Sequence, residues 1–199
     1  MDTNPRVGEP PIRIDEEDSP WRRHNRTVVY ENDWITVYHD DVRRPDGNPG
    51  IYGVVHYRNR AVGIVAIDHR DRLLLVGQFR YTIGKYSWEI PAGGCPAGEE
   101  PIETARRELK EETGYTAKSL RLLVVAHLSN SVSDEKAFCY LAEDLTPGQP
   151  APEVTEQLQV QWEDFASVLH RIERQEITDA LTILAVQQTA LMRLANQGV

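Results

Sequence analysis

Three glutamates, Glu108, Glu111 and Glu112, are spaced three and four residues apart in a stretch with a helical pattern. At about 100° per residue they fall in one sector of the helix, where like charges destabilise it by about 0.2–0.5 kcal/mol per pair. Two of them also stand near the C-terminal end, where the helix dipole disfavours anions. A bound hard cation would offset these costs, and Mg²⁺ needs few carboxylates when substrate phosphates supply further oxygens. The alternative is a solvated acidic face on an ordinary helix.

The helix that carries these acids is predicted to span residues 101–113. Pro101 suits the first turn, where its missing N–H costs nothing, and Gly114 suits the left-handed position just past the end. Glu103 and Arg107 lie four residues apart, so an ion pair between them is expected on this helix.

The elements around this helix follow from short apolar runs and turn residues. Three runs before the main body predict an antiparallel sheet: residues 27–30, 34–38 and 51–55. Four further strands are expected at residues 61–67, 73–76, 120–126 and 137–141, with a loop rich in Pro and Gly at 91–98. Two helices are expected at the C-terminal end, at residues 162–174 and 178–196. This order predicts an α/β fold with three parts, namely a flexible tail (1–22), an N-terminal β region (23–58) and the main domain (59–199).

Composition limits the class of protein. The chain has 199 residues with 22 Lys and Arg against 31 Asp and Glu, a net charge of −9, and 40% of it is apolar. These values are typical of a globular domain and argue against a nucleic-acid partner, which would favour a basic face. No stretch approaches the roughly 18 apolar residues that span a bilayer, so no membrane partner is expected. Cys95 and Cys139 form neither a disulfide framework nor a zinc site, which favours reduced thiols in the cytoplasm.

The stretch from Gly93 to Tyr115 resembles the signature of Nudix hydrolases, Gly-x5-Glu-x7-Arg-Glu-U-x-Glu-Glu-x-Gly-U, where U is a bulky apolar residue. Tyr115 is an aromatic residue where an aliphatic one is more usual. The residues that match in register are Gly93, Glu99, Arg107, Glu108, Leu109, Glu111, Glu112 and Gly114. The resemblance implies an α/β/α sandwich built around a mixed sheet. It also implies metal-dependent hydrolysis of a nucleoside diphosphate linked to another moiety.

The resemblance also implies roles for the matched positions. It implies a site for Mg²⁺ or Mn²⁺ whose ligands are the Ala92 carbonyl and the carboxylates of Glu108, Glu111 and Glu112. Among these, Glu112 is the best candidate for a part in catalysis. Glu99 would support the site, and Arg107 would orient a glutamate through a bidentate pair. Gly93 and Gly114 would allow the chain to turn tightly and to approach phosphate or metal.

Residues outside the signature resemble the ADP-ribose and nucleotide-sugar pyrophosphatase branch of the family, through the segments 78–81 and 88–93. Members of this branch carry an N-terminal β region that helps to form a homodimer. Asn130 stands where members that hydrolyse ADP-ribose commonly have proline, so other nucleotide sugars stay open as substrates. The substrate-binding candidates are Arg80 as a phosphate clamp, Tyr81 and Trp88 as stacking surfaces, and Glu135 in the loop that contains Asn130. For Arg80 the alternative is an ion pair with a local carboxylate, and for Trp88 it is a core position.

The reaction expected from the resemblance is hydrolysis of a nucleoside diphosphate sugar to a nucleoside monophosphate and a sugar phosphate. Glu156 is the first candidate for the general base and Glu153 the second, because the family places this group on a loop before the last strand. Two alternatives remain open. One is a hydrolase of another nucleoside diphosphate derivative, such as a dinucleotide. The other is an inactive nucleotide-sensing module on the same fold.

Overall fold

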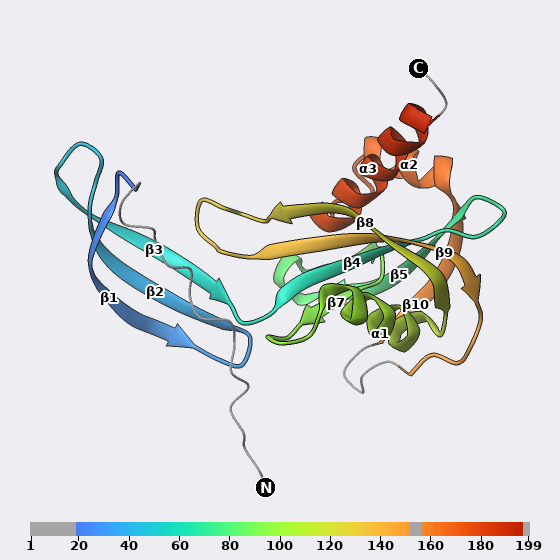
Figure 1. Cartoon of the computed structure of the whole chain (residues 1–199), viewed down its shortest axis with the longest axis horizontal. Coiled ribbons are helices and arrows are strands. Elements are labelled where there is room, and N and C mark those ends of the chain that lie inside the picture. The colour runs from blue at the N-terminus through green and yellow to red at the C-terminus, as the bar shows by residue number, and fades with distance from the viewer. Residues whose placement is uncertain (1–18, 152–156, 197–199) are drawn as a thin grey trace, which may run out of the picture. The chain divides into compact units, whose positions relative to one another are not determined.

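The computed structural model describes residues 19–151 and 157–196, which form two compact units (Figure 1). Unit 1 contains the described residues up to 60, together with 96–98 and 127–136. Unit 2 contains residues 61–95 and 99–126 and the described residues from 137 onward. Most of the predicted tail, residues 1–22, lies outside the described residues.

Unit 1 is built on an antiparallel sheet of three strands in the order β1-β2-β3. The strands are β1 (Arg22–Glu31), β2 (Ile35–Arg43) and β3 (Pro49–Tyr57). The turn between β1 and β2 is closed by Asn32, whose Oδ1 accepts the backbone N–H groups of Trp34 and Ile35 at 2.9 and 2.8 Å. Such side-chain acceptance is the chemistry expected of an Asn at a turn. The predicted antiparallel N-terminal sheet is therefore confirmed.

Unit 2 contains a sheet of four strands in the order β7-β4-β9-β8 and a sheet of three in the order β10-β5-β6. The strands before α1 are β4 (Arg60–Ala66), β5 (Arg72–Arg80), β6 (Lys85–Glu89) and β7 (Ala92–Cys95). Those after it are β8 (Thr116–His127), β9 (Lys136–Thr146) and β10 (Gln159–Asp164). Strand β4 pairs parallel to β9, whereas β5 pairs antiparallel with both β6 and β10. The strands of unit 2 are thus of mixed direction, as predicted.

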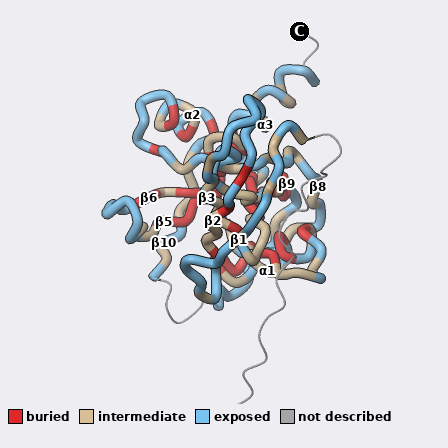
Figure 2. Tube along the Cα trace, turned by 90° about the vertical axis from the view of Figure 1, so that its left-hand side faces the viewer, coloured by how far each residue is buried: buried red, intermediate tan, exposed pale blue. Residues whose placement is uncertain are grey.

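The helices of unit 2 are α1 (Pro101–Thr113), α2 (Phe165–Glu173) and α3 (Ala180–Asn196), with a short 3₁₀ turn, η1 (Tyr81–Ile83), in the β5–β6 hairpin. Figure 1 shows α1 on one side of the strands and α2 and α3 on the other. Apolar residues fill the space between α1 and the strands: Val62, Ile64, Leu74, Ala105, Leu109 and Tyr140. Figure 2 shows buried segments of β5 and α1 in red. The three layers confirm the predicted α/β class.

One predicted element was wrong at its start. The helix expected at 162–174 begins at Phe165, because residues 159–164 form strand β10 against β5. Val160 and Trp162 are separated by one residue, the two-residue period of a strand. None of the helices in the described residues is both long and apolar enough to cross a membrane.

Candidate functional site

Two carboxylates of α1 lie against adjacent residues of strand β7. The N–H of Ala92 donates to Oε2 of Glu112 at 3.0 Å, and Glu112 is only 3% exposed. The carboxylate of Glu108 lies against Gly93 so closely that a Cβ at Gly93 would overlap it. A buried carboxylate is costly without a hydrogen-bond donor or a counter-charge. The backbone of Ala92–Gly93 therefore brings together two of the predicted metal ligands.

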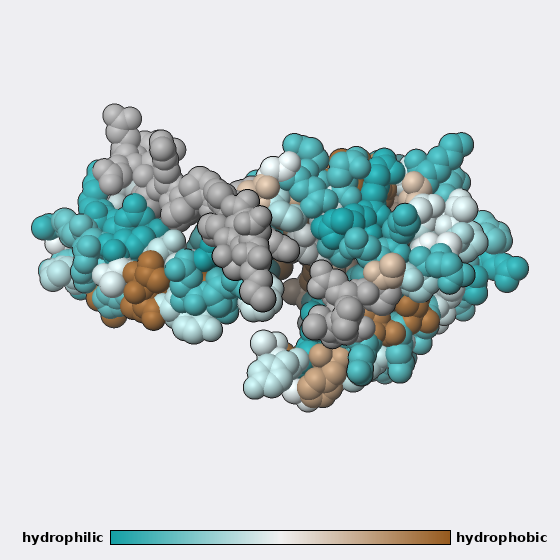
Figure 3. All heavy atoms as spheres, turned by 90° about the horizontal axis from the view of Figure 1, so that it is seen from below, coloured by the Kyte–Doolittle hydropathy of each residue, from teal (hydrophilic) through white to brown (hydrophobic). Residues whose placement is uncertain are grey.

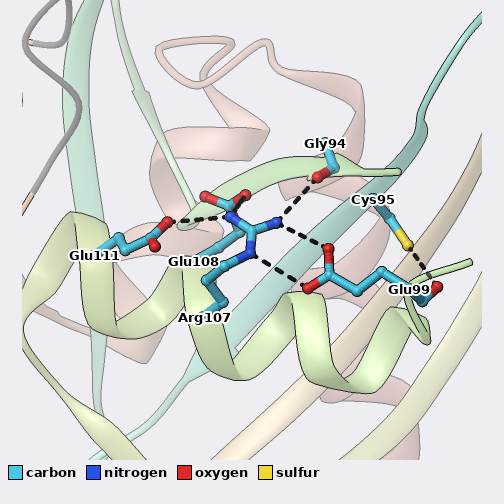
Figure 4. A network of polar contacts seen from close by, with 6 residues as sticks. All are labelled: Gly94, Cys95, Glu99, Arg107, Glu108 and Glu111. Carbon is cyan, nitrogen blue, oxygen red and sulfur yellow. Dashed lines mark hydrogen bonds and ion pairs between the residues drawn. The ribbon is translucent and has the colours of Figure 1, made fainter. Parts of the chain in front are cut away.

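Arg107 links three carboxylates and one carbonyl (Figure 4). Its Nε and Nη2 donate to the two oxygens of Glu99 at 3.2 and 3.4 Å. Its Nη1 donates to Glu108 at 2.6 Å and to Glu111 at 3.0 Å, and Nη2 also reaches the carbonyl of Gly94 at 3.2 Å. A planar guanidinium can serve several acceptors because its five N–H groups point in fixed directions. The repulsion expected between the acids of α1 is thus reduced by one cation.

The charge state of Arg107 follows from these contacts. Burial lowers the pKa of the guanidinium, but the hydrogen bonds to Glu99 and the charge of Glu108 outweigh it and raise the pKa above its ordinary value. The predicted pair between Glu103 and Arg107 was wrong, because Arg107 turns toward β7. Glu103 lies instead 3.6 Å from Arg106, in an exposed pair that contributes little to stability.

The donor set near β7 fits a hard divalent cation. Within the described residues no three acidic, histidine or cysteine side chains converge on one point as a preformed metal cage. Arg107 contacts both Glu108 and Glu111, but Glu111 is 40% exposed, whereas Glu108 and Glu112 lie at Ala92–Gly93. Mg²⁺ is commonly held by one or two carboxylates, with water and phosphate oxygens filling the remaining positions. The oxygens of Glu108, Glu112 and the Ala92 carbonyl match that mode of binding.

Arg80 lies at the end of β5 and is paired with Glu89 of β6. Its Nε donates to Oε1 of Glu89 at 3.0 Å and its Nη2 to Oε2 at 2.5 Å. The hydrogen bond with Glu89 raises the pKa of Arg80 although burial lowers it. The ion pair with a local carboxylate therefore forms. It uses Nε and Nη2, so the two protons of Nη1 lie outside the Glu89 pair.

The other predicted substrate residues belong to different elements. Tyr81 is 92% exposed in η1, and Trp88 packs edge-on against Tyr86 with ring centroids 5.7 Å apart. Glu135 belongs to unit 1, in the segment 127–136. Gly114 has a φ of +78° and its N–H reaches the carbonyl of Lys110, which closes α1 as predicted. The two candidates for the general base, Glu153 and Glu156, lie outside the described residues.

Unit 1 contains a pocket of about 440 Å³ that the sequence reading missed. Arg26 donates to Asp40 at 2.6 and 2.7 Å and stacks over the ring of Tyr38 at 4.3 Å. Nδ1 of His56 lies 2.5 Å from a carboxylate oxygen of Asp134. The signal was present, because Tyr38 and Asp40 are two residues apart in β2 and so share one face of the sheet. Aromatic rings and two largely buried ion pairs thus line this pocket.

Comparisons with known proteins agree with this geometry. Residues 57–181 match the family model described as "NUDIX domain", and residues 21–55 match "Nucleoside diphosphate sugar hydrolase N-terminal domain". An ADP-ribose pyrophosphatase of Bacillus subtilis is 34% identical over 82% of this chain and 89% of its own length. An ADP-ribose pyrophosphatase of Mycobacterium tuberculosis is 37% identical over 74% of this chain and 72% of its own. A crystal structure of an ADP compounds hydrolase superposes with a TM-score of 0.80 at 26% identity, covering 89% of this chain and 96% of that one.

Proposed function

The chain belongs to the Nudix hydrolase family, and from that premise we propose that it hydrolyses the diphosphate bond of a nucleoside diphosphate sugar. The observation that carries the proposal is the meeting of Glu108 and Glu112 at Ala92–Gly93. The names of the relatives, two of them ADP-ribose pyrophosphatases, support a sugar-linked diphosphate as substrate. The products are then a nucleoside monophosphate and a sugar phosphate, and one water molecule is consumed.

Nudix hydrolases generally need a divalent metal, and we propose Mg²⁺ or Mn²⁺ held by Ala92, Glu108 and Glu112. When bound, such an ion neutralises phosphate oxygens and lowers the pKa of a bound water. This is important in a chain with a net charge of −9, which offers a dianionic diphosphate little general attraction. Glu111 supports the site through Arg107, because Nη1 of this arginine donates to both Glu111 and Glu108.

The chain's own residues supply binding and proton transfer. Arg80 is the proposed phosphate clamp. Glu89 fixes the Nε and Nη2 edge of its guanidinium, so the orientation of Nη1 is already set before substrate binds. Tyr81 offers a largely exposed ring that a base or sugar can contact. Glu156, with Glu153 second, is the proposed base that takes a proton from the attacking water.

A homodimer is the proposed assembly, with unit 1 as the contact region. Its support is the exposed apolar surface of that unit, which Figure 3 shows as brown atoms on the left, and the match of residues 21–55 to the N-terminal domain model. The exposed side chains are Val28, Val29, Tyr30, Trp34 and Ile51. The proposed compartment is the cytoplasm, since Cys95 and Cys139 are both buried free thiols.

A substrate panel tests the activity. The purified protein is incubated with ADP-ribose, UDP-glucose, GDP-mannose, NADH and a dinucleoside polyphosphate, each with Mg²⁺ and with excess chelator. We expect a nucleoside monophosphate and a sugar phosphate to appear only with Mg²⁺. Ligand binding without turnover of any compound would instead establish the sensing alternative. A higher kcat/KM for GDP-mannose or UDP-glucose than for ADP-ribose would support the interpretation of Asn130.

A further inference from the structure

A chain of hydrogen bonds connects helix α3 to the segment that precedes β7. The N–H of Ile90 donates to Oγ1 of Thr182 at 3.0 Å, and this hydroxyl donates to Oδ2 of Asp179 at 2.7 Å. The N–H of Thr182 donates to the same Oδ2 at 2.8 Å. Thr182 is fully buried and Ile90 is 1% exposed, so water does not substitute for these bonds. Because Oγ1 already accepts from Ile90, its own proton is directed to Asp179.

The segment Ile90–Ala92 is fixed from three different elements. Thr182 of α3 accepts the N–H of Ile90, and Ile64 of β4 donates its N–H to the carbonyl of Pro91 at 2.8 Å. Glu112 of α1 accepts the N–H of Ala92 at 3.0 Å. The bond from α3 is the one of the three that depends on a neutral side chain, and Asp179 strengthens it as an ionised acceptor.

We propose that Thr182, supported by Asp179, is a positioning residue that fixes the Ile90–Ala92 backbone so that the Ala92 carbonyl and Glu112 hold a divalent metal together. The inference rests on the proposed metal site. Its physical reason is that Mg²⁺ requires near-ideal octahedral geometry at about 2.0–2.1 Å, so a backbone ligand that can shift binds it less tightly. Groups that orient a ligand from outside typically contribute about 10–100-fold to metal affinity or activity.

A purely structural role would be helix capping. Asp179 precedes Ala180, the first residue of α3, and its acceptance of the Thr182 N–H is an N-cap interaction. Capping needs the backbone N–H of Thr182 but not its hydroxyl. Thr189 provides the matched control, because it is also fully buried in α3, and its hydroxyl donates to the carbonyl of Ala185 in the same helix, at 2.8 Å.

The test measures Mn²⁺ binding to the metal-free protein by electron paramagnetic resonance of free Mn²⁺. Thr182→Val, which removes the hydroxyl at nearly constant shape, is expected to raise the Kd for Mn²⁺ at least about tenfold. Thr182→Ser, which restores the hydroxyl, and Thr189→Val are each expected to stay near the wild-type Kd. In turnover assays Thr182→Val should lose kcat at limiting Mn²⁺ and recover part of it at excess Mn²⁺, with little change in the KM for the nucleotide.

The outcomes separate this role from the metal site itself. A Kd in Thr182→Val equal to that of the wild type, or an equal loss in Thr189→Val, would overturn the positioning role alone. Absence of Mn²⁺ binding to the wild type would overturn the metal site and the role together. Should Thr182→Val fail to fold, Asp179→Asn tests the positioning role instead, because Asn keeps the helix cap but not the charge. It is expected to raise the Kd about threefold, as charge-assisted bonds are roughly twice as strong as neutral ones, and an unchanged Kd contradicts the proposal.

Discussion

The two units differ in what they bury. Unit 2 has an apolar core between α1 and its strands, which includes Val62, Leu74 and Leu109. In the described part of unit 1, Val42 is the only buried apolar residue, and the charged Asp40 is buried beside it. Hydrophobic burial is the main favourable term in folding, so unit 1 depends more on ion pairs and on strand pairing than unit 2 does. The apolar surface that unit 1 exposes is consistent with the proposed homodimer.

The difference also separates two uses of a partly buried arginine. In unit 1, Arg26 serves one carboxylate, Asp40, and the result is a structural ion pair. In unit 2, Arg107 shares its donors among several acids, and one of them, Glu108, lies against β7. The first arrangement satisfies a buried charge, whereas the second also holds acids at the site proposed for metal.

The largest effect on stability is expected from Arg26→Ala. It leaves Asp40, whose side chain is 3% exposed, as a buried charge without its partner, which typically costs about 3–5 kcal/mol. Arg44→Ala is the control, because Arg44 and Asp46 form an exposed pair at 3.5 Å and should contribute under about 1 kcal/mol. Hydrogen exchange of β1–β3 measures both variants. Equal protection in the two would contradict the dependence of unit 1 on its ion pairs.

The largest effect on catalysis is expected from Glu112→Gln. Glutamine can still accept the N–H of Ala92 but loses the charge, so kcat should fall by at least about 100-fold, given that outer-shell changes alone cost 10–100-fold. The thermal midpoint should change little. Glu103→Gln, on the same helix but 62% exposed, should keep wild-type kcat. Steady-state kinetics on the best substrate of the panel checks this, and a similar loss in both variants would refute the role of Glu112.

A smaller effect is expected from adding one methyl group to a strand glycine in each unit. Gly93→Ala in unit 2 forces the Glu108 carboxylate away from β7 and should cost about 1–3 kcal/mol, together with weaker Mn²⁺ binding. At Gly53 in unit 1, nothing lies within 4 Å of the position that a new Cβ would take. Gly53→Ala should therefore leave the free energy of unfolding unchanged or slightly raised. Urea unfolding of the two variants gives the comparison. Equal midpoints would show that β7 is not closely packed on α1.

The smallest effect on folding is expected from Trp34→Glu, since this side chain is 69% exposed. Within one protomer the change should stay near 0.5 kcal/mol. In solution, however, the variant should sediment as a monomer if the apolar face of unit 1 forms the proposed dimer. Leu194→Glu, at an exposed position of α3 in unit 2, should sediment as the wild type does. A Trp34→Glu variant that remains dimeric would exclude this residue from the interface.

Local signals explain the parts of the fold that the sequence predicted. Helix α1 has the predicted bounds because Pro101 and Gly114 both suit its ends, and Gly114 adopts the left-handed conformation with φ of +78°. Strand β10 was missed because the apolar residues of this short segment were read as the start of the following helix. Short runs of this kind are ambiguous by periodicity alone.

Contacts between distant residues could not be predicted, because they depend on strand register and on packing. Arg26 meets Asp40 only because the register of β1 and β2 places these two residues opposite each other. Arg107 pairs with Glu99 rather than with Glu103 because β7 and the loop between β7 and α1 pack on this helix. The bond between Ile90 and Thr182 joins residues 92 positions apart, and no local pattern encodes it.

The most direct test of the central claim is a crystal of the protein soaked in Mn²⁺, with anomalous scattering used to locate the ion. We expect one ion within bonding distance, about 2.1 Å, of the Ala92 carbonyl or a carboxylate oxygen of Glu112, with Glu108 nearby. An ion elsewhere, or a fully soaked crystal with no ion near β7, would contradict the assignment of this site to divalent metal.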